Sequence, residues 1–212
     1  MRRVVGSVTV IVGAALALAA AGPAPARAPC SVPLLAYHTG TVALTDGGRI
    51  TRVRVQIADT AERQEIGLMC RPTLEPDAGM LFEFPVATRT SFWMKNTLIP
   101  LAIAFMDGRW RIIKIVEMPV APDPTADDPS KFPQYDPGGR FCYALEVNSG
   151  FFKAHEISNR AEVRFVPQDG SPPSCAGGAA HPPATWEGVT ISGFLSRQRI
   201  GKPAHPTANT AF

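Results

Sequence analysis

Apolar and polar residues alternate most regularly between positions 49 and 57. One face of this segment carries Val53, Val55 and Ile57, and the other carries arginines and a glutamine. A period of two residues is typical of a β-strand with one face in the core and the other in water. The turn-forming sequence DGG stands just before it at 46–48, so the pattern predicts a hairpin whose first strand lies at 41–44.

Shorter apolar runs predict the rest of the sheet. We expect further strands at 80–84, 90–95, 101–106, 110–118, 141–147 and 162–166. The run at 101–106 is apolar on both faces, which favours a central strand. Asp59 can cap a short helix with Glu62 as its reciprocal partner, and a second short helix is expected at 149–156. The sequence therefore predicts a β-rich α+β domain of about seven or eight mostly antiparallel strands with one or two short helices.

The chain has 212 residues, and its two ends differ from the middle in composition. Residues 1–26 have the features of a secretory signal peptide: two arginines, a long apolar run and small residues around Ala26. Residues 27–40 form a lead-in, 41–167 a single domain, and 168–212 a tail rich in Pro, Gly and Ala, which we expect to be largely disordered. The mature protein is thus predicted to be exported, periplasmic or secreted, with no stable membrane span after signal cleavage. A signal retained as an anchor is the alternative.

Charge and cysteine content narrow the class of protein. Two arginines of the signal segment account for most of the net charge of +3, and no basic run remains to bind nucleic acid. An oxidising compartment permits disulfides, and the chain has Cys30, Cys70, Cys142 and Cys175. Cys30 and Cys175 flank the domain and could tie its extensions together, whereas the two inner cysteines could be small core residues. The sequence leaves the pairing open.

Three strings in the domain resemble the motifs of a known family. They are RQEIGLMCR at 63–71, GMLFEF at 79–84 and FWMKNTLIPLAIAF at 92–105. Their order is similar to that of domain of unknown function 192 (DUF192), and the resemblance extends over about 53–166. It implies a compact, barrel-like sheet in an exported protein with no settled activity. Ala102 stands where the family usually has Asp, and Asn159-Arg160 where it often has Gly-Asp. No catalytic acid or base is therefore carried over, which weakens an enzymatic interpretation.

The segment 91–96 contains the most suggestive candidate site. If it is extended, Trp93 and Lys95 lie on one face, and an aromatic ring beside a cation suits a sugar ring or an acidic small molecule. The structural alternative is that Trp93 is half-buried and the Lys95 stem extends past it. Asn96 lies just before Ile99-Pro100 and is more typical of a turn residue that bonds its own backbone.

Glu146 is the carboxylate that we expect opposite this pair. In the predicted strand at 141–147 it shares a face with small residues, Cys142 and Ala144, while the aromatic and aliphatic residues form the other face. Small neighbours leave space for a ligand or for a long basic side chain. An unpaired buried carboxylate is costly, so an ion pair to Arg63, Arg71 or Lys95 is the structural alternative.

These observations support one leading hypothesis and two alternatives. The leading hypothesis is an exported, non-catalytic binding module for a small polar ligand or a cell-envelope carbohydrate. Its candidate ligand-binding residues are Arg63, Arg71, Trp93, Lys95, Asn96 and Glu146. One alternative is a hydrolase or lyase that uses Glu146 as general acid/base. The other is a structural or protein-interaction module that uses the Asp-rich and Pro-rich loop at 119–139. No cofactor or metal is predicted, because the four histidines lack metal-binding spacing and the methionines lie in apolar runs.

Overall fold

The structure is a computed structural model that describes residues 30–170 together with Cys175 and Ala176. The predicted signal peptide and most of the predicted disordered tail lie outside the described residues. Within the described part, none of the helices has the length and apolar character needed to cross a membrane.

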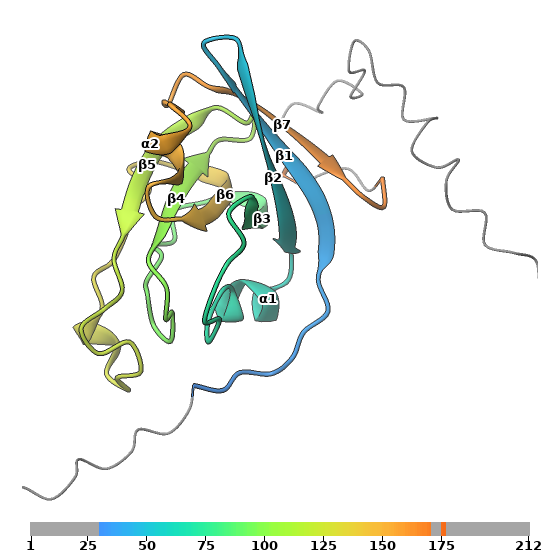
Figure 1. The fold of residues 1–212 in the computed structure, drawn as a ribbon. Coiled ribbons are helices and arrows are strands. Elements are labelled where there is room, and N and C mark those ends of the chain that lie inside the picture. The colour runs from blue at the N-terminus through green and yellow to red at the C-terminus, as the bar shows by residue number, and fades with distance from the viewer. Residues whose placement is uncertain (1–29, 171–174, 177–212) are drawn as a thin grey trace, which may run out of the picture.

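Seven strands in the described residues form one sheet with the order β5-β4-β6-β3-β2-β1-β7 (Figure 1). Their bounds are β1 (His38–Asp46), β2 (Arg49–Ala58), β3 (Ala78–Thr88), β4 (Leu101–Met106), β5 (Ile112–Met118), β6 (Phe141–Asn148) and β7 (Glu162–Pro167). Only the β2–β3 pair is parallel, and the other five pairs are antiparallel. The helices are α1 (Ala61–Ile66), α2 (Phe151–Ala154) and the single 3-10 turn η1 (Pro129–Lys131). The predicted β-rich α+β fold is confirmed. The sheet is open, because its end strands β5 and β7 are not paired with each other.

The β1–β2 hairpin follows the sequence pattern closely. Val53, Val55 and Ile57 are buried, and Arg52 and Arg54 on the other face are exposed. The tight turn needs Gly47 and Gly48, whose φ angles of 54° and 80° disfavour residues with a side chain. The hairpin is longer than predicted, since pairing with both β2 and β7 extends β1 well beyond its apolar centre.

Helix α1 makes the crossover that lets β2 and β3 run parallel. Its N-cap is Thr60, whose hydroxyl accepts a hydrogen bond from the Arg63 backbone at 3.3 Å. The predicted cap at Asp59 is wrong, because that carboxylate is used by the Arg63 guanidinium at 2.5 Å. Gly67 ends the helix with a φ of 49°, and its backbone N–H bonds the Arg63 carbonyl at 2.9 Å.

The two faces of the sheet bury separate apolar clusters. The first core lies on the face that carries Val53, Val55 and Ile57 and is closed by Phe151 and Phe152 of α2. The second core lies on the opposite face and is covered by loop residues; its members include Met80, Phe82, Ile103 and Phe105 of the sheet and Leu68 and Met94 of the loops. Strand β4 is buried along its whole length between β5 and β6, as expected of a central strand.

The predicted strand at 90–95 is wrong, since this segment is a loop. Only Phe92 is paired, through an isolated bridge to Tyr135, with N···O distances of 3.1 and 2.8 Å. The bridge fastens the long 119–140 loop to the rest of the domain. Phe132 of that loop is buried with two alanines, and Trp93 packs against them. The apolar side chains of this loop therefore pack against one another and against Trp93 within the domain.

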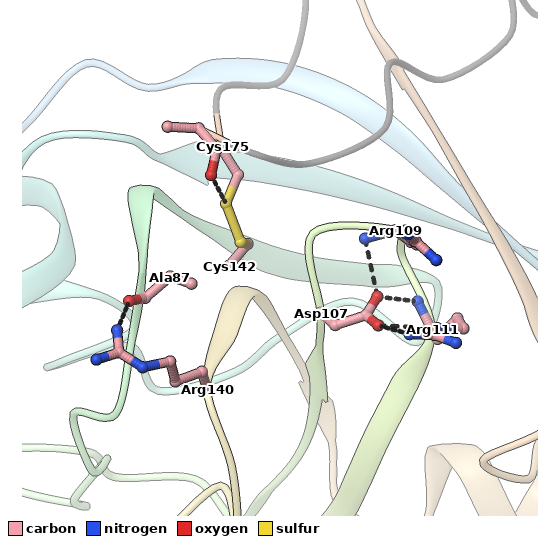
Figure 2. Close-up of a disulfide and its surroundings, with 8 residues drawn as sticks. Ala87, Asp107, Arg109, Arg111, Arg140, Cys142 and Cys175 are labelled. Carbon is pink, nitrogen blue, oxygen red and sulfur yellow. Dashed lines mark hydrogen bonds and ion pairs between the residues drawn. A yellow bond between two sulfur atoms is a disulfide. The ribbon is translucent and has the colours of Figure 1, made fainter.

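Two disulfides hold the ends of the described chain. Cys30 is bonded to Cys70, and Cys142 to Cys175. The pairing that the sequence left open is therefore one flanking cysteine with one inner cysteine in each bridge, and the alternative in which the inner cysteines are unpaired core residues is wrong. The first bridge ties the lead-in to the loop after α1, and the second ties the end of the described chain to β6 (Figure 2).

The predicted faces of β6 are wrong at its start. Phe141 belongs to the second core with Ala144, whereas Cys142 and Tyr143 belong to the first core. The cause is an irregularity in the β3–β6 pairing, where the register shifts between Glu83 and Thr88. A shift of one residue moves a side chain to the other face of a sheet. Only Phe141 and Cys142 depart from the prediction, and from Tyr143 onward the predicted alternation holds.

Candidate functional site

The face that carries the second core becomes polar toward the outer strands. In register with Glu146 of β6 lies Met80 of β3, which is in turn paired with Gln56 of β2. Gln56 is paired with Thr39 of β1. Side chains at directly paired positions emerge on one face, so this row leads from a buried carboxyl group to the half-buried amide of Gln56 and the exposed hydroxyl of Thr39.

A pocket of about 700 Å³ lies over these outer strands. We call it the β1–β3 pocket; its polar lining side chains are Thr39, Thr41, Arg54, Gln56, Arg71, Thr73, Glu75 and Gln168. Thr41 and Arg54 are directly paired, two residues along the strands from Thr39 and Gln56 and therefore on the same face. The pocket thus has a floor of polar side chains on a rigid hairpin and a wall formed by the loop at 71–75.

Arg71 is fixed at the edge of this pocket. Its guanidinium donates to Oε1 of Gln56 at 2.5 Å and lies 5.8 Å from the ring centre of Tyr37. Burial raises the pKa of Tyr37, and Arg71 partly offsets the rise. The preceding Cys70 has a φ of 59°, is bridged to Cys30 and donates its N–H to the Asn96 carbonyl at 2.8 Å. These contacts hold the loop so that the Arg71 guanidinium stays over β2.

Arg54 supplies the second guanidinium. Its backbone N–H bonds the Asp77 carbonyl at 2.8 Å, which fixes the strand against the start of β3. Its side chain is exposed and makes no ion pair with a described residue. Asn148 donates to the carbonyls of Leu74 and Glu75, both at 3.1 Å, and so positions the wall of the pocket. The pocket lining carries two guanidiniums and one carboxylate.

Glu146 is buried without the basic partner that the structural alternative predicts. It is only 5 % exposed, and among the described residues no hydrogen bond or ion pair reaches its carboxyl group. Burial raises the pKa of Glu146 from 4.5 to about 8. The arginines are used elsewhere, since Arg63 pairs with Asp59 and Arg71 with Gln56. Lys95 lies by Trp93 instead. Glu146 is therefore a largely neutral acid at neutral pH.

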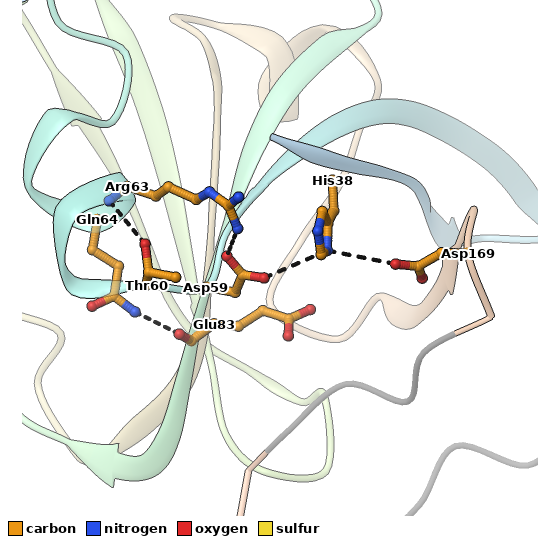
Figure 3. A network of polar contacts seen from close by, with 7 residues as sticks. All are labelled: His38, Asp59, Thr60, Arg63, Gln64, Glu83 and Asp169. Atoms are coloured by element: carbon orange, nitrogen blue, oxygen red, sulfur yellow. Dashed lines mark hydrogen bonds and ion pairs between the residues drawn. The ribbon is translucent and has the colours of Figure 1, made fainter. Parts of the chain in front are cut away.

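Arg63 belongs to a separate polar network (Figure 3). Its guanidinium contacts one oxygen of Asp59, and the other oxygen lies 3.7 Å from Nδ1 of His38. The same His38 nitrogen lies 3.5 Å from Asp169, which follows β7. This network joins the start of β1 to the ends of β2 and β7, and Arg63 is not among the residues that line the β1–β3 pocket.

The Trp93–Lys95 pair forms as a local contact. Nζ of Lys95 lies 5.6 Å from the Trp93 ring centre, within the range of a cation–π interaction. Phe132 meets the same indole edge-to-face at a centroid distance of 5.9 Å, and Trp93 is half-buried. Asn96 is a turn residue with a φ of 53° whose N–H bonds the Pro124 carbonyl at 2.5 Å. None of the three lines the β1–β3 pocket.

Of the six candidate residues, Arg71 alone lines this pocket, and Asn96 supports the loop that carries Arg71. Sequence reasoning missed Arg54, Gln56 and Thr39. The alternation in β2 placed Arg54 and Gln56 on one polar face, but that face was interpreted as merely solvated. Among the described residues, no group of three or more His, Cys, Asp or Glu side chains is arranged to hold a metal ion.

The chain belongs to the DUF192 family (Uncharacterized ACR), whose model matches residues 42–165. No curated protein is significantly similar. Among solved structures, it is similar to a Sinorhizobium meliloti 1021 protein described provisionally as a transcription regulator, with 30% identity and a TM-score of 0.55. That match covers 63% of this chain and 98% of the other. It is also similar to a Novosphingobium aromaticivorans DSM 12444 protein of unknown function, with 28% identity and a TM-score of 0.54, over 66% and 94% of the two chains.

Proposed function

We propose that this chain is an exported, non-catalytic binding module whose β1–β3 pocket takes a small polar ligand with a carboxylate group, such as an acidic cell-envelope carbohydrate. The observation that carries the proposal is the convergence of Arg54 and Arg71 on one pocket of about 700 Å³. A planar guanidinium pairs with a carboxylate through two parallel hydrogen bonds. The proposal keeps the predicted ligand class and moves the site from the Trp93–Lys95 pair to the hairpin.

The remaining lining groups favour a ligand that also carries hydroxyl groups. Thr39, Thr41 and Thr73 offer hydroxyls, and Gln56 and Gln168 offer amides, so donors and acceptors surround the two arginines. Glu75 adds an acceptor for hydroxyl hydrogens. Its charge makes the pocket less favourable for a ligand with several negative charges. A sugar acid, with one carboxylate and several hydroxyls, matches this balance.

Export is part of the proposal and is supported by the cysteines. All four are paired, and none of the described cysteines is free. Disulfides persist in oxidising compartments and are rare in the cytosol. Together with the predicted signal segment, the two bridges favour a periplasmic or secreted protein.

The catalytic alternative has one observation in its favour. Glu146 carries no clamp of positive charge, and its raised pKa would let it donate a proton near neutral pH. A general acid must reach its substrate, however, and Glu146 lines neither of the two pockets described for this structure. Binding is therefore the function that we propose.

Titration of the full mature chain with D-galacturonate, D-galactose and acetate tests the proposal. We expect chemical-shift changes around Arg54 and Arg71 with galacturonate and weaker binding by each of the other two ligands. Arg54→Ala and Arg71→Ala should each weaken galacturonate binding about tenfold. Arg89→Ala removes an exposed arginine outside the pocket and serves as the matched control. Shifts confined to other surfaces, or equal affinity in all variants, would overturn the proposal.

A further inference from the structure

A second pocket, of about 550 Å³, lies between two loops far apart in the sequence. One wall is the β4–β5 loop at 107–111, and the other is the end of the α2–β7 loop at 159–161 with the start of β7. It shares no lining residue with the β1–β3 pocket. We call it the arginine pocket because Arg109, Arg111 and Arg160 all line it.

The β4–β5 loop is held rigidly by Asp107 (Figure 2). Its carboxylate accepts from the backbone N–H groups of Arg109 and Arg111, at 2.8 and 3.0 Å, and from Nε of Arg111 at 2.8 Å. Burial of Asp107 opposes ionisation, but these hydrogen bonds prevail and lower its pKa. The backbone that carries Arg109 is therefore already ordered, so ligand binding would not have to pay the entropy of ordering this loop.

Trp110 adds a strained conformation to this loop. Its φ of 62° lies in the left-handed region, where bulky residues are rare. The indole, 3 % exposed, stacks on Tyr143 at 3.9 Å and on Phe165 at 5.5 Å. This packing supports the strained backbone, and Trp110 is among the residues that line the pocket.

The opposite wall is anchored to the β1–β2 hairpin. Oδ2 of Asp46 accepts from the backbone N–H and the hydroxyl of Ser158, at 2.8 and 2.7 Å. The Ser158 oxygen in turn accepts from the Arg160 backbone at 3.2 Å, and the Ala161 N–H bonds the Ser158 carbonyl at the same distance. Arg160 is thus presented from a second loop with a fixed backbone.

The charges of the arginine pocket do not cancel. Asp107 is paired with Arg111 at 2.7 Å, and Glu162 with Arg164 at 2.7 Å. Both carboxylates of the lining are therefore compensated by neighbours within their own segments. The guanidiniums of Arg109 and Arg160 make no ion pair with a described residue. Arg109 and Arg160 thus leave net positive charge around the pocket. The Asp46 carboxylate partly offsets the charge of Arg160, since hydrogen bonds from Ser158 and the nearby Arg160 lower the pKa of Asp46.

We propose that the arginine pocket is a second ligand site, which binds a compact dianion between Arg109 and Arg160. Phosphate monoesters and short dicarboxylates share the required chemistry, since each presents two negative charges to two guanidiniums. The site differs in kind from the β1–β3 pocket. In the β1–β3 pocket, the lining carboxylate and the many neutral polar side chains favour a singly charged ligand with hydroxyl groups. The lining of the arginine pocket includes no side chain with a hydroxyl group.

Titration of the full mature chain with inorganic phosphate, glycerol 3-phosphate, succinate and acetate at low salt tests this site. We expect one class of dianion to bind at least about tenfold more tightly than acetate and to shift the indole N–H signal of Trp110. Binding of phosphate and its ester alone would identify a phosphate site, and binding of succinate alone a dicarboxylate site. Either outcome supports the proposal.

Four variants separate the arginine pocket from general surface charge. Arg109→Ala and Arg160→Ala should each weaken binding of the preferred dianion about tenfold, and the double variant should abolish the Trp110 shift. Arg89→Ala loses one positive charge, as each single variant does, but outside both pockets, and should bind as the unchanged protein does. Equal binding by the double variant and the Arg89→Ala control, or equal affinity for acetate and every dianion, would overturn the proposal.

Discussion

Glu146 lies directly opposite Met80 in the antiparallel β3–β6 pair, so a carboxyl group emerges beside a fully buried methionine. Ile103 of β4 flanks it on the other side in the same register. These apolar neighbours offer a carboxylate no hydrogen bond and no opposite charge, and they exclude the water that would hydrate it. This relationship explains the raised pKa of Glu146 and gives it a consequence for stability.

Because the folded-state pKa of Glu146 is about 8 and its ordinary value is 4.5, the folded protein retains a proton that the unfolded chain loses within this window. The free energy of unfolding should therefore fall as the pH rises from 4.5 to 8. Glu146→Gln removes this titration. We expect a flatter pH dependence. The loss of unfolding free energy between pH 4.5 and 8 should be smaller in this variant than in the unchanged protein by on the order of 2–4 kcal/mol. Urea unfolding across this pH range measures it.

The control for this prediction is Glu65→Gln, which changes an exposed glutamate of α1. It should leave the pH dependence of unfolding as it is in the unchanged protein. If Glu146→Gln and Glu65→Gln retain the same slope between pH 5 and pH 8, Glu146 is ionised in the folded state and the assignment of a neutral acid is incorrect.

The sequence was sufficient where local pattern and burial coincide. The alternation around Val53 predicted both faces of β2, and the double-faced apolar run at Leu101–Met106 predicted a buried central strand. The segment around Trp93 has the same local alternation but forms a loop, because Phe92 and Met94 are drawn onto the second core. Local pattern does not distinguish a strand from a loop that covers a sheet.

The candidate site was only partly predictable for a related reason. Arg63 pairs with Asp59, four residues away in the sequence, and Arg71 donates a hydrogen bond to Gln56 of the neighbouring strand β2. Neither arginine is therefore available to pair with Glu146. Competition among possible partners depends on three-dimensional distances. Ala102 illustrates the same limit: it is buried in the first core, on the face opposite to Glu146, so the acid usual at this position would not have joined that site.

The disulfide pairing predicts separable effects on stability. A double Cys→Ala change removes either bridge. The Cys142–Cys175 bridge joins residues 33 positions apart in the sequence, and the Cys30–Cys70 bridge joins residues 40 positions apart. Each should lower the free energy of unfolding by about 3 kcal/mol, chiefly by loosening the unfolded chain. Peptide mapping without reductant should recover these two bridged pairs. A peptide that links Cys30 to Cys175 would contradict the pairing.

Gly79 is predicted to tolerate no side chain. A Cβ at this position would lie 2.4 Å from the Glu146 carbonyl oxygen and 3.1 Å from side chains of Val53 and Val147. The backbone of β6 cannot yield without breaking the β3–β6 ladder, so Gly79→Ala should cost about 2 kcal/mol or more. Gly139→Ala, whose nearest contact is 3.8 Å away, is the matched control and should change stability little. Thermal unfolding of both variants measures the difference.

Trp93 distinguishes the two locations considered for the ligand. Its indole packs against Phe132 and Lys95 outside the β1–β3 pocket, so Trp93→Ala should leave galacturonate affinity unchanged while it loosens the 119–140 loop. Because Trp93 is only half-buried, we expect a loss of stability of about 1–2 kcal/mol, less than for a fully buried aromatic side chain, and faster amide exchange around Phe132. Isothermal titration is carried out about 15 degrees below the melting temperature of Trp93→Ala, so that the variant stays folded. Arg71→Ala is the positive control for lost binding. If Trp93→Ala abolishes galacturonate binding and Arg71→Ala does not, the ligand lies at the aromatic pair and the hairpin is not its site.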